Sequence, residues 1–155
     1  MKKDGGIKIV AQNKKARSDY FIEDTFEAGM ALMGTEVKSL REGRANLKDS
    51  YAREKDGRMV LVGAHISPYP FGNRVNHEPE RERQLLLHKQ EIRRLTGKVR
   101  ERGYALVPLK IYFKEGKAKL EIGLGKGKAQ YDKRQAIKKR EQDREMERAV
   151  RGRGR

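Results

Sequence analysis

The fold is decided by residues 104–124, which read YALVPLKIYFKEGKAKLEIGL. Apolar side chains alternate with other residues in both halves of this stretch, at Leu109, Ile111 and Phe113 and again at Leu120, Ile122 and Leu124. Alternation of this kind is typical of a β-strand that buries one face. Between the halves, Lys114-Glu-Gly116 has the composition of a tight turn. The stretch therefore predicts two antiparallel strands, 104–113 and 117–124, joined as a hairpin.

More strands are predicted towards the N-terminus. Residues 7–11 alternate, and residues 20–33 predict a longer strand with a bulge or sharp bend at Gly29. A second hairpin is predicted within residues 50–67, where Asp56-Gly57 separates two segments of β character. Most connections are too short for parallel crossovers, so we expect the strands to pair antiparallel.

Two helices are predicted between the strands. Thr35 is expected to cap a helix that runs to Arg44. The clearest helix spans residues 88–102 and is stopped by Gly103. Its apolar residues share one face, at Ile92, Leu95 and Val99.

Together these elements predict a mainly β fold. Residues 13–19 are interpreted as a basic turn, and residues 68–82, which hold three of the four prolines, as a loop. We expect residues 1–125 to form a small OB-like closed antiparallel barrel with two to three flanking helices. Residues 126–155 are predicted to be a separate basic C-terminal tail.

The charge of the chain points to a polyanionic partner. The 38 Lys and Arg residues exceed the 22 Asp and Glu residues by 16. Residues 126–155 carry 12 basic and five acidic residues and few large apolar ones. We therefore expect the tail to be disordered in isolation and helical when bound to something acidic. A tail that only confers solubility is the alternative.

Several kinds of chemistry are not expected. The absence of Cys excludes disulfides, Cys-ligated zinc and thiol catalysis, and no apolar run approaches the roughly 20 residues of a membrane helix. His65, His77 and His88 are isolated from other metal ligands. No coherent set of acid, base or nucleophile is present, so we expect neither an enzyme nor a cofactor. We expect no secretory signal at the N-terminus, and we therefore expect a cytoplasmic location.

A glycine-rich segment, Gly123-Leu-Gly125-Lys-Gly127-Lys128, invites comparison with a phosphate-binding loop. It lacks the spacing and the Ser or Thr of that motif, so a nucleotide site is not expected. Two interpretations remain open together. Its backbone amides and lysines could contact phosphate oxygens at the end of a strand, or the segment could be a flexible exit from the barrel.

Basic residues recur in clusters through the predicted barrel, at Lys14, Lys15 and Arg17, at Arg41 and Arg44, at Arg81 and Arg83, and at Arg93 and Arg94. Together they predict a phosphate-binding surface with salt-dependent affinity. Aromatic residues make up only 6% of the chain, so recognition of folded RNA by shape and backbone is favoured over extensive base stacking. Composition alone does not exclude DNA as the binding partner.

Short sequence strings along nearly the whole chain resemble the SsrA-binding protein family, also called small protein B. They are Asn13-Lys-Lys-Ala-Arg17, Asp19-Tyr-Phe-Ile22, Phe26-Glu-Ala-Gly29, Gly34-Thr-Glu-Val-Lys-Ser-Leu-Arg41, Asp49-Ser-Tyr51, Leu85-Leu-Leu-His88, Gly103-Tyr104, Val107-Pro-Leu-Lys-Ile-Tyr112, Gly125-Lys-Gly127 and Tyr131-Asp-Lys-Arg134. Their number and common order make coincidence an inadequate explanation. His88 stands where some relatives have Asn, and both side chains form hydrogen bonds.

The resemblance implies a role in trans-translation, the rescue of stalled ribosomes. It implies that the barrel binds the tRNA-like domain of transfer-messenger RNA, and that elongation factor Tu joins the delivery complex. By position, the implied RNA-binding residues are Asn13, Arg17, Glu27, Leu86, His88 and Lys119. The implied ribosome-engaging tail residues are Gly127, Tyr131, Asp132, Lys133, Arg134 and Ile137. The tail is expected to enter the empty decoding centre and message channel of the small ribosomal subunit.

Three other functions are weighed against this one. A generic OB-type ribosomal or initiation protein would bind many RNAs with similar affinity. An RNA-processing enzyme would show turnover, but its required set of catalytic residues is missing. A protein that binds acidic membranes would need an amphipathic helix with a large apolar face, and none is predicted.

Overall fold

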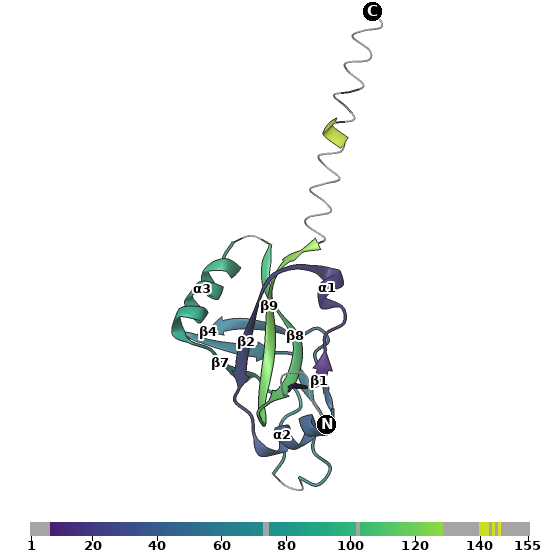
Figure 1. Cartoon of the computed structure of the whole chain (residues 1–155), viewed down its shortest axis with the longest axis vertical. Helices are drawn as coiled ribbons and strands as arrows, with labels where there is room; N and C mark the ends of the chain where they lie inside the picture. The colour runs from purple at the N-terminus through teal and green to yellow at the C-terminus, as the bar shows by residue number, and fades with distance from the viewer. Residues whose placement is uncertain are drawn as a thin grey trace, which may run out of the picture.

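A ring of antiparallel strands forms the body of the molecule (Figure 1). The computed structural model describes residues 7–72, 75–101, 103–128, 140–142, 144 and 146. In chain order the elements are β1 (Ile7–Gln12), α1 (Ala16–Asp19), β2 (Tyr20–Met30), α2 (Gly34–Arg41), β3 (Ala45–Asn46), β4 (Tyr51–Lys55), β5 (Arg58–Val62), β6 (His65–Ile66), β7 (Arg83–Leu86), α3 (Lys89–Val99), β8 (Tyr104–Lys114) and β9 (Lys117–Gly127).

The ring closes where strand β8 pairs with strand β9. Its strand order is β8-β4-β5-β7-β2-β9, and β9 pairs back with β8. The edge of β8 away from β9 is shared, because β4 pairs with it at Leu106 and β1 pairs with it from Lys110 to Lys114. Strands β3 and β6 form a separate small sheet. The predicted closed antiparallel barrel with flanking helices is confirmed.

Both predicted hairpins have the turns that their sequences indicate. Asp56 and Gly57 join β4 to β5 with φ of 52° and 79°, and Glu115 and Gly116 join β8 to β9 with φ of 52° and 77°. Two successive positive φ angles are the signature of the tight turn that matches the twist of paired strands. The hairpin registers are therefore fixed locally.

The barrel interior is apolar and is shared by two helices. Buried side chains from the ring include Ala28, Met59, Leu61, Leu85, Leu106, Ile111, Leu120 and Ile122. Helix α2 adds Leu40 and α3 adds Leu95, each with no exposed surface. Figure 1 shows these two helices on different sides of the barrel, so one core holds both in place. Of the other predicted inward residues of α3, Ile92 is partly buried and Val99 is 38% exposed.

A second, smaller apolar cluster lies outside this core. Ala16 of α1 packs there with Val107 and Leu109 of β8. A register shift between Pro108 and Lys110 separates Leu109 from Ile111, which belongs to the main core. The alternation predicted to place both residues in one core is therefore interrupted by a bulge.

Two glycines of β9 make room for this outer cluster. A Cβ at Gly123 would lie 3.1 Å from Ile22 Cδ1, and a Cβ at Gly125 would lie 2.9 Å from Tyr20 Cβ. The strand that contains them pairs with β2 on one edge and with β8 on the other. The predicted contact of free backbone amides with phosphate is therefore wrong for residues 123–127, whereas the predicted contact of the lysines in this segment stays a prediction. Its glycines permit close packing instead.

A buried ion-pair network, which we call the Glu36 network, ties α2 to β7. Glu36 Oε2 accepts a hydrogen bond from Arg83 Nε at 2.5 Å, and neither side chain has exposed surface. Glu36 Oε1 accepts one from Arg81 Nη2 and another from the backbone N–H of Met33. Arg83 also donates to the carbonyl oxygens of Ala64, Glu78 and Pro79. The predicted loop 68–82 is thereby held against the barrel.

Local details of the N-terminal half differ from the predictions. The bulge of β2 lies between Ile22 and Asp24, not at Gly29. The backbone of Met33, held by Glu36, caps α2, whereas Thr35 lies inside the helix and its hydroxyl contacts His77 Nδ1 at 2.9 Å.

Element bounds differ as well. Helix α2 ends at Arg41 instead of residue 44, because Gly43 has φ of +72°. Residues 13–19, predicted as a turn, include the short helix α1. Strand β7 was not predicted at all.

The predicted tail lies mostly outside the described residues. Strand β9 continues to Gly127, where it pairs with Tyr20. Residues 140–142, 144 and 146 have helical backbone and exposed side chains. Within the described residues, no helix is both long and apolar enough to span a membrane.

Candidate nucleic-acid interface

Four of the six predicted RNA-binding residues line one groove, which we call the β2–β7 groove. Its volume is about 560 Å³, and it is lined by Glu27, Leu86, His88 and Lys119 together with Gly29, Arg58 and Lys89. The pairing of strands brings them together. Gly29 pairs with Leu86 on one side and with Lys119 on the other, and Glu27 lies two residues earlier on the same face of β2.

The floor of this groove depends on Gly29. A Cβ at this position would lie 3.2 Å from Leu86 Cβ, tighter than ordinary contact. Leu86 itself is 53% exposed, which is unusual for a leucine on a strand. The groove therefore offers an apolar side chain among charged ones, suited to contact with the face of a base or a sugar.

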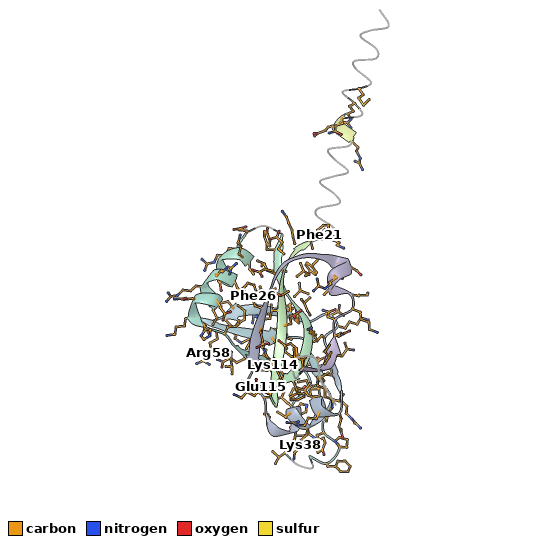
Figure 2. The ribbon with its side chains drawn as sticks, viewed as in Figure 1. Phe21, Phe26, Lys38, Arg58, Lys114 and Glu115 are labelled. Carbon is orange, nitrogen blue, oxygen red and sulfur yellow. The ribbon has the colours of Figure 1, made fainter. Side chains whose placement is uncertain are left out.

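Glu27 is held in a fixed position in the groove. Tyr112 donates its hydroxyl hydrogen to Glu27 Oε2, and Lys114 Nζ lies 3.5 Å from the same oxygen. The Tyr112 hydrogen bond, with smaller contributions from Lys114 and Lys119, lowers the pKa of Glu27 despite partial desolvation. Burial and the same carboxylate raise the pKa of Tyr112. Figure 2 shows Lys114 near the turn that contains Glu115.

A carboxylate can recognise only hydrogen-bond donors. Glu27 Oε1 has no partner among the described residues, so it is free to accept a hydrogen bond from a ligand. In RNA the donors are amino and imino groups of bases and the 2′-hydroxyl, whereas phosphate is repelled. An acidic group inside a basic groove therefore favours specific contacts over general attraction to phosphate.

The rim of the β2–β7 groove is basic. Lys119, Arg58 and Lys89 line it, and these three side chains form no ion pair within the described part of the chain. His88 precedes α3, whose start is capped by Glu91 accepting from the His88 backbone N–H at 3.1 Å. His88 therefore lies both at the start of α3 and in the groove. Sequence reasoning missed Arg58 and Lys89, because charge alone does not tell which cations share a groove.

Asn13 and Arg17 lie away from this groove. Asn13 Nδ2 donates to the carbonyl oxygen of Pro108 at 3.0 Å, and the Asn13 N–H donates to the Leu109 carbonyl at 2.8 Å. Asn13 lines a different groove of about 790 Å³ beside α1 and β4. Arg17 is exposed on α1, and its carbonyl oxygen accepts from Lys128 Nζ at 2.8 Å. Asn13 therefore fixes the end of β1 onto β8.

The predicted tail residues are described only at their start. Gly127 is the last residue of β9. The other predicted tail residues lie outside the described residues: Tyr131, Asp132, Lys133, Arg134 and Ile137. Lys128, next to Gly127, has its Nζ 5.0 Å from the centre of the Phe21 ring.

Two of the histidines lie outside the groove and away from any cluster of metal ligands among the described residues. The described residues contain no group of three or more His, Asp or Glu side chains placed to hold a metal ion. His77 is buried and bonded to Thr35 and to the carbonyl oxygen of Ile66, so its role is structural. His65 lies 4.0 Å from Glu80 at the surface.

Comparisons with a family model and with known proteins all match this chain to one family. The family model described as SmpB protein matches residues 10–152. An "SsrA-binding protein" of Geobacter metallireducens is 60% identical over 148 residues, which cover 96% of this chain and 97% of that protein. A protein of the same name from Geobacillus thermodenitrificans is 59% identical over 149 residues, 96% of each chain.

A solved structure gives the same result for the fold. It is described as "tmRNA-SmpB: a journey to the center of the bacterial ribosome". Its matching chain is 54% identical in sequence, with a TM-score of 0.64, over 75% of this chain and 82% of that chain.

Proposed function

The chain belongs to the SmpB protein family. From this premise we propose that it binds the tRNA-like domain of transfer-messenger RNA, also called SsrA RNA, and delivers this RNA to stalled ribosomes in trans-translation. The observation that carries the proposal is the identity of about 60% with proteins named SsrA-binding protein over nearly the full length of both chains. The family is one of RNA-binding proteins, and no reaction is proposed.

The β2–β7 groove supplies the contact surface for this RNA. Leu86 provides an apolar contact, Glu27 accepts a hydrogen bond from a base or a 2′-hydroxyl, and Lys119 neutralises phosphate. His88 adds a side chain that can donate or accept a hydrogen bond. This combination suits a folded RNA whose bases and sugars are presented at defined positions.

The tail supports the second half of the role. We propose that residues 126–155, with 12 basic side chains, enter the vacant decoding centre and message channel of the small subunit. The residues that engage the ribosome would be Gly127, Tyr131, Asp132, Lys133, Arg134 and Ile137. A segment that becomes ordered on binding has a low affinity by itself. The RNA held by the barrel keeps the tail near the ribosome and so raises the effective concentration of the tail there. Delivery with elongation factor Tu and a cytoplasmic location belong to the same proposal.

The test is a gel shift at about physiological salt with the full chain. It compares the tRNA-like domain of transfer-messenger RNA with an ordinary tRNA and with an unrelated hairpin of equal length. Clear preference for the first RNA is the expected result. Equal binding to all three, with collapse at higher salt, would show that only the net charge of +16 is recognised. The generic OB-type RNA-binding protein would then be the better description.

A further inference from the structure

A second groove, which we call the α3 groove, continues from the β2–β7 groove along helix α3. It has a volume of about 540 Å³ and lies between α3 and the β4–β5 hairpin. The two grooves share Gly57, Lys89 and Ile92 as lining residues. In Figure 2, Arg58 of the β2–β7 groove lies on the side of the barrel that α3 covers. A ligand in the first groove is therefore led directly into the second.

The cations of the α3 groove are not used by the fold. Lys89, Arg93 and Arg100 line it, and none of these three side chains has a hydrogen bond or ion pair within the described residues. The other basic residues of the same helix are engaged, since Arg94 Nη2 lies 3.3 Å from Asp24 and Lys98 Nζ lies 3.8 Å from Glu101. The helix thus has a paired basic face and an unpaired one.

The spacing of the unpaired cations suits a phosphate backbone. Positions 89, 93 and 100 fall on one stripe of an α-helix, separated along its axis by about 6 Å and about 10 Å. This is the scale of one and two nucleotide steps. The acidic side chain that lines the groove is Glu54, whose Oε1 is held by the Gly57 N–H at 2.7 Å. The groove therefore remains strongly cationic.

Gly97 gives an independent indication of a close neighbour. It lies inside α3 and lines the α3 groove, and a Cβ there would meet nothing within 4 Å. Glycine is among the least favourable residues in a helix interior, so folding does not explain its presence. A residue without a side chain allows another backbone to approach the helix closely.

We propose that the α3 groove is a second segment of the RNA interface, in which Lys89, Arg93 and Arg100 bind phosphates of the RNA held by the β2–β7 groove and Gly97 lets that backbone approach. This inference rests on the proposed function and extends it to residues outside the four that line the first groove. RNA fits the α3 groove better than an acidic protein segment does. Lys89 lines both grooves, so one ligand can occupy both. The three unpaired cations also have no fully exposed apolar side chain among them that would bind a protein segment.

The test compares two double variants of the full chain that lose the same charge from the same helix. Arg93→Gln/Arg100→Gln removes unpaired cations of the α3 groove, and Arg94→Gln/Lys98→Gln removes the paired ones. The dissociation constant for the tRNA-like domain of transfer-messenger RNA is measured over a range of salt concentrations. The first variant should bind about tenfold or more weakly, and its salt slope should fall by about 1.5. The second should change little.

Glycine 97 provides a test that separates binding from folding. Gly97→Gln should raise the melting temperature by about 3 °C through better helix propensity and yet weaken RNA binding by obstructing the backbone. Gly97→Ala should raise the melting temperature with a smaller effect on binding.

Three outcomes would overturn the inference. In the first, the two double variants bind alike, so that only total charge matters. In the second, Gly97→Gln binds RNA as well as the native chain does. In the third, the Arg93 and Arg100 variant binds RNA normally but fails in ribosome rescue, which would assign the groove to another macromolecule. Failure of the proposed function is distinguishable, because the native chain would then not prefer this RNA over an ordinary tRNA.

Discussion

Replacement of Arg83 by Met should destabilise the barrel strongly. Arg83 and Glu36 have no exposed surface, so the substitution leaves a carboxylate in the core with Arg81 as its one remaining ion-pair partner among the described residues. It also removes the donors to three carbonyl oxygens, of Ala64 at 2.8 Å, Pro79 at 2.9 Å and Glu78 at 3.3 Å. Breaking a buried ion pair by removing one partner costs about 3–5 kcal/mol.

This loss is large compared with the total stability of a domain this size. A loss of about 4 kcal/mol is a third or more of a typical unfolding free energy, and it should lower the melting temperature by about 15 °C. Thermal and urea unfolding followed by circular dichroism measure both quantities. Arg81→Met is the matched control, because Arg81 bonds the same carboxylate but is 35% exposed. It should lower stability by only about 1 kcal/mol.

The Glu36 network also predicts how the free energy of unfolding falls at acid pH. Burial raises the pKa of Glu36, but hydrogen bonds from Arg81, the Met33 N–H and Arg83 outweigh it, so the folded pKa lies below the ordinary value. The resulting stabilisation is complete above the unfolded pKa, about 4.3, and is lost as pH falls through the folded pKa. Glu36→Gln should therefore reduce the loss of stability between neutral and acid pH.

The first prediction has a clear refutation. If Arg83→Met lowers the free energy of unfolding no more than Arg81→Met does, the reasoning about burial is refuted.

Three further results are expected. Glu27→Gln and His88→Ala should each weaken specific RNA binding with the melting temperature nearly unchanged. The amide still accepts from Tyr112, and Glu91 still accepts from the backbone N–H of residue 88. A large loss of stability would reassign either residue as structural. Deleting the residues after Lys128 should leave RNA binding nearly intact and abolish rescue, and loss of RNA binding in a gel shift would refute the division into barrel and tail. Gly125→Ala should lower the melting temperature, because its Cβ would lie 2.9 Å from Tyr20 Cβ; unchanged unfolding would contradict the close packing.

The strands and turns of the barrel were largely predictable from local sequence. Asp56, Gly57 and Gly116 adopt the positive φ angles that their residue types favour, and Glu115 follows its glycine into the same kind of turn. Gly103 also has the positive φ expected of a glycine stop, +89°, but α3 ends at Val99 and not at the predicted residue 102. These features depend on a few neighbouring residues, so a single sequence contains the information that decides them.

The bulges and strand β7 depended on more distant contacts. The bulge of β2 lies where Ile22 must pack over the glycines of β9, not at the glycine of β2 itself. Strand β7 has only four residues and little alternation, and it forms because β5 and β2 offer edges on both sides of it. Periodicity within a segment cannot report the edges that another segment presents.

The sequence by itself determined the class of fold, the two hairpins and the family to which the chain belongs. Only the tertiary structure decided which charged residues act together. Glu36 and Arg83 look like surface residues in the sequence, yet they form a buried pair 47 residues apart. Likewise, Lys119 joins Glu27 and Leu86 in one groove because β9 and β7 both pair with Gly29, whereas Asn13 is directed to a backbone carbonyl of β8. Local periodicity fixes which face of a strand is apolar, but the partners of a polar side chain depend on how the ring of strands closes.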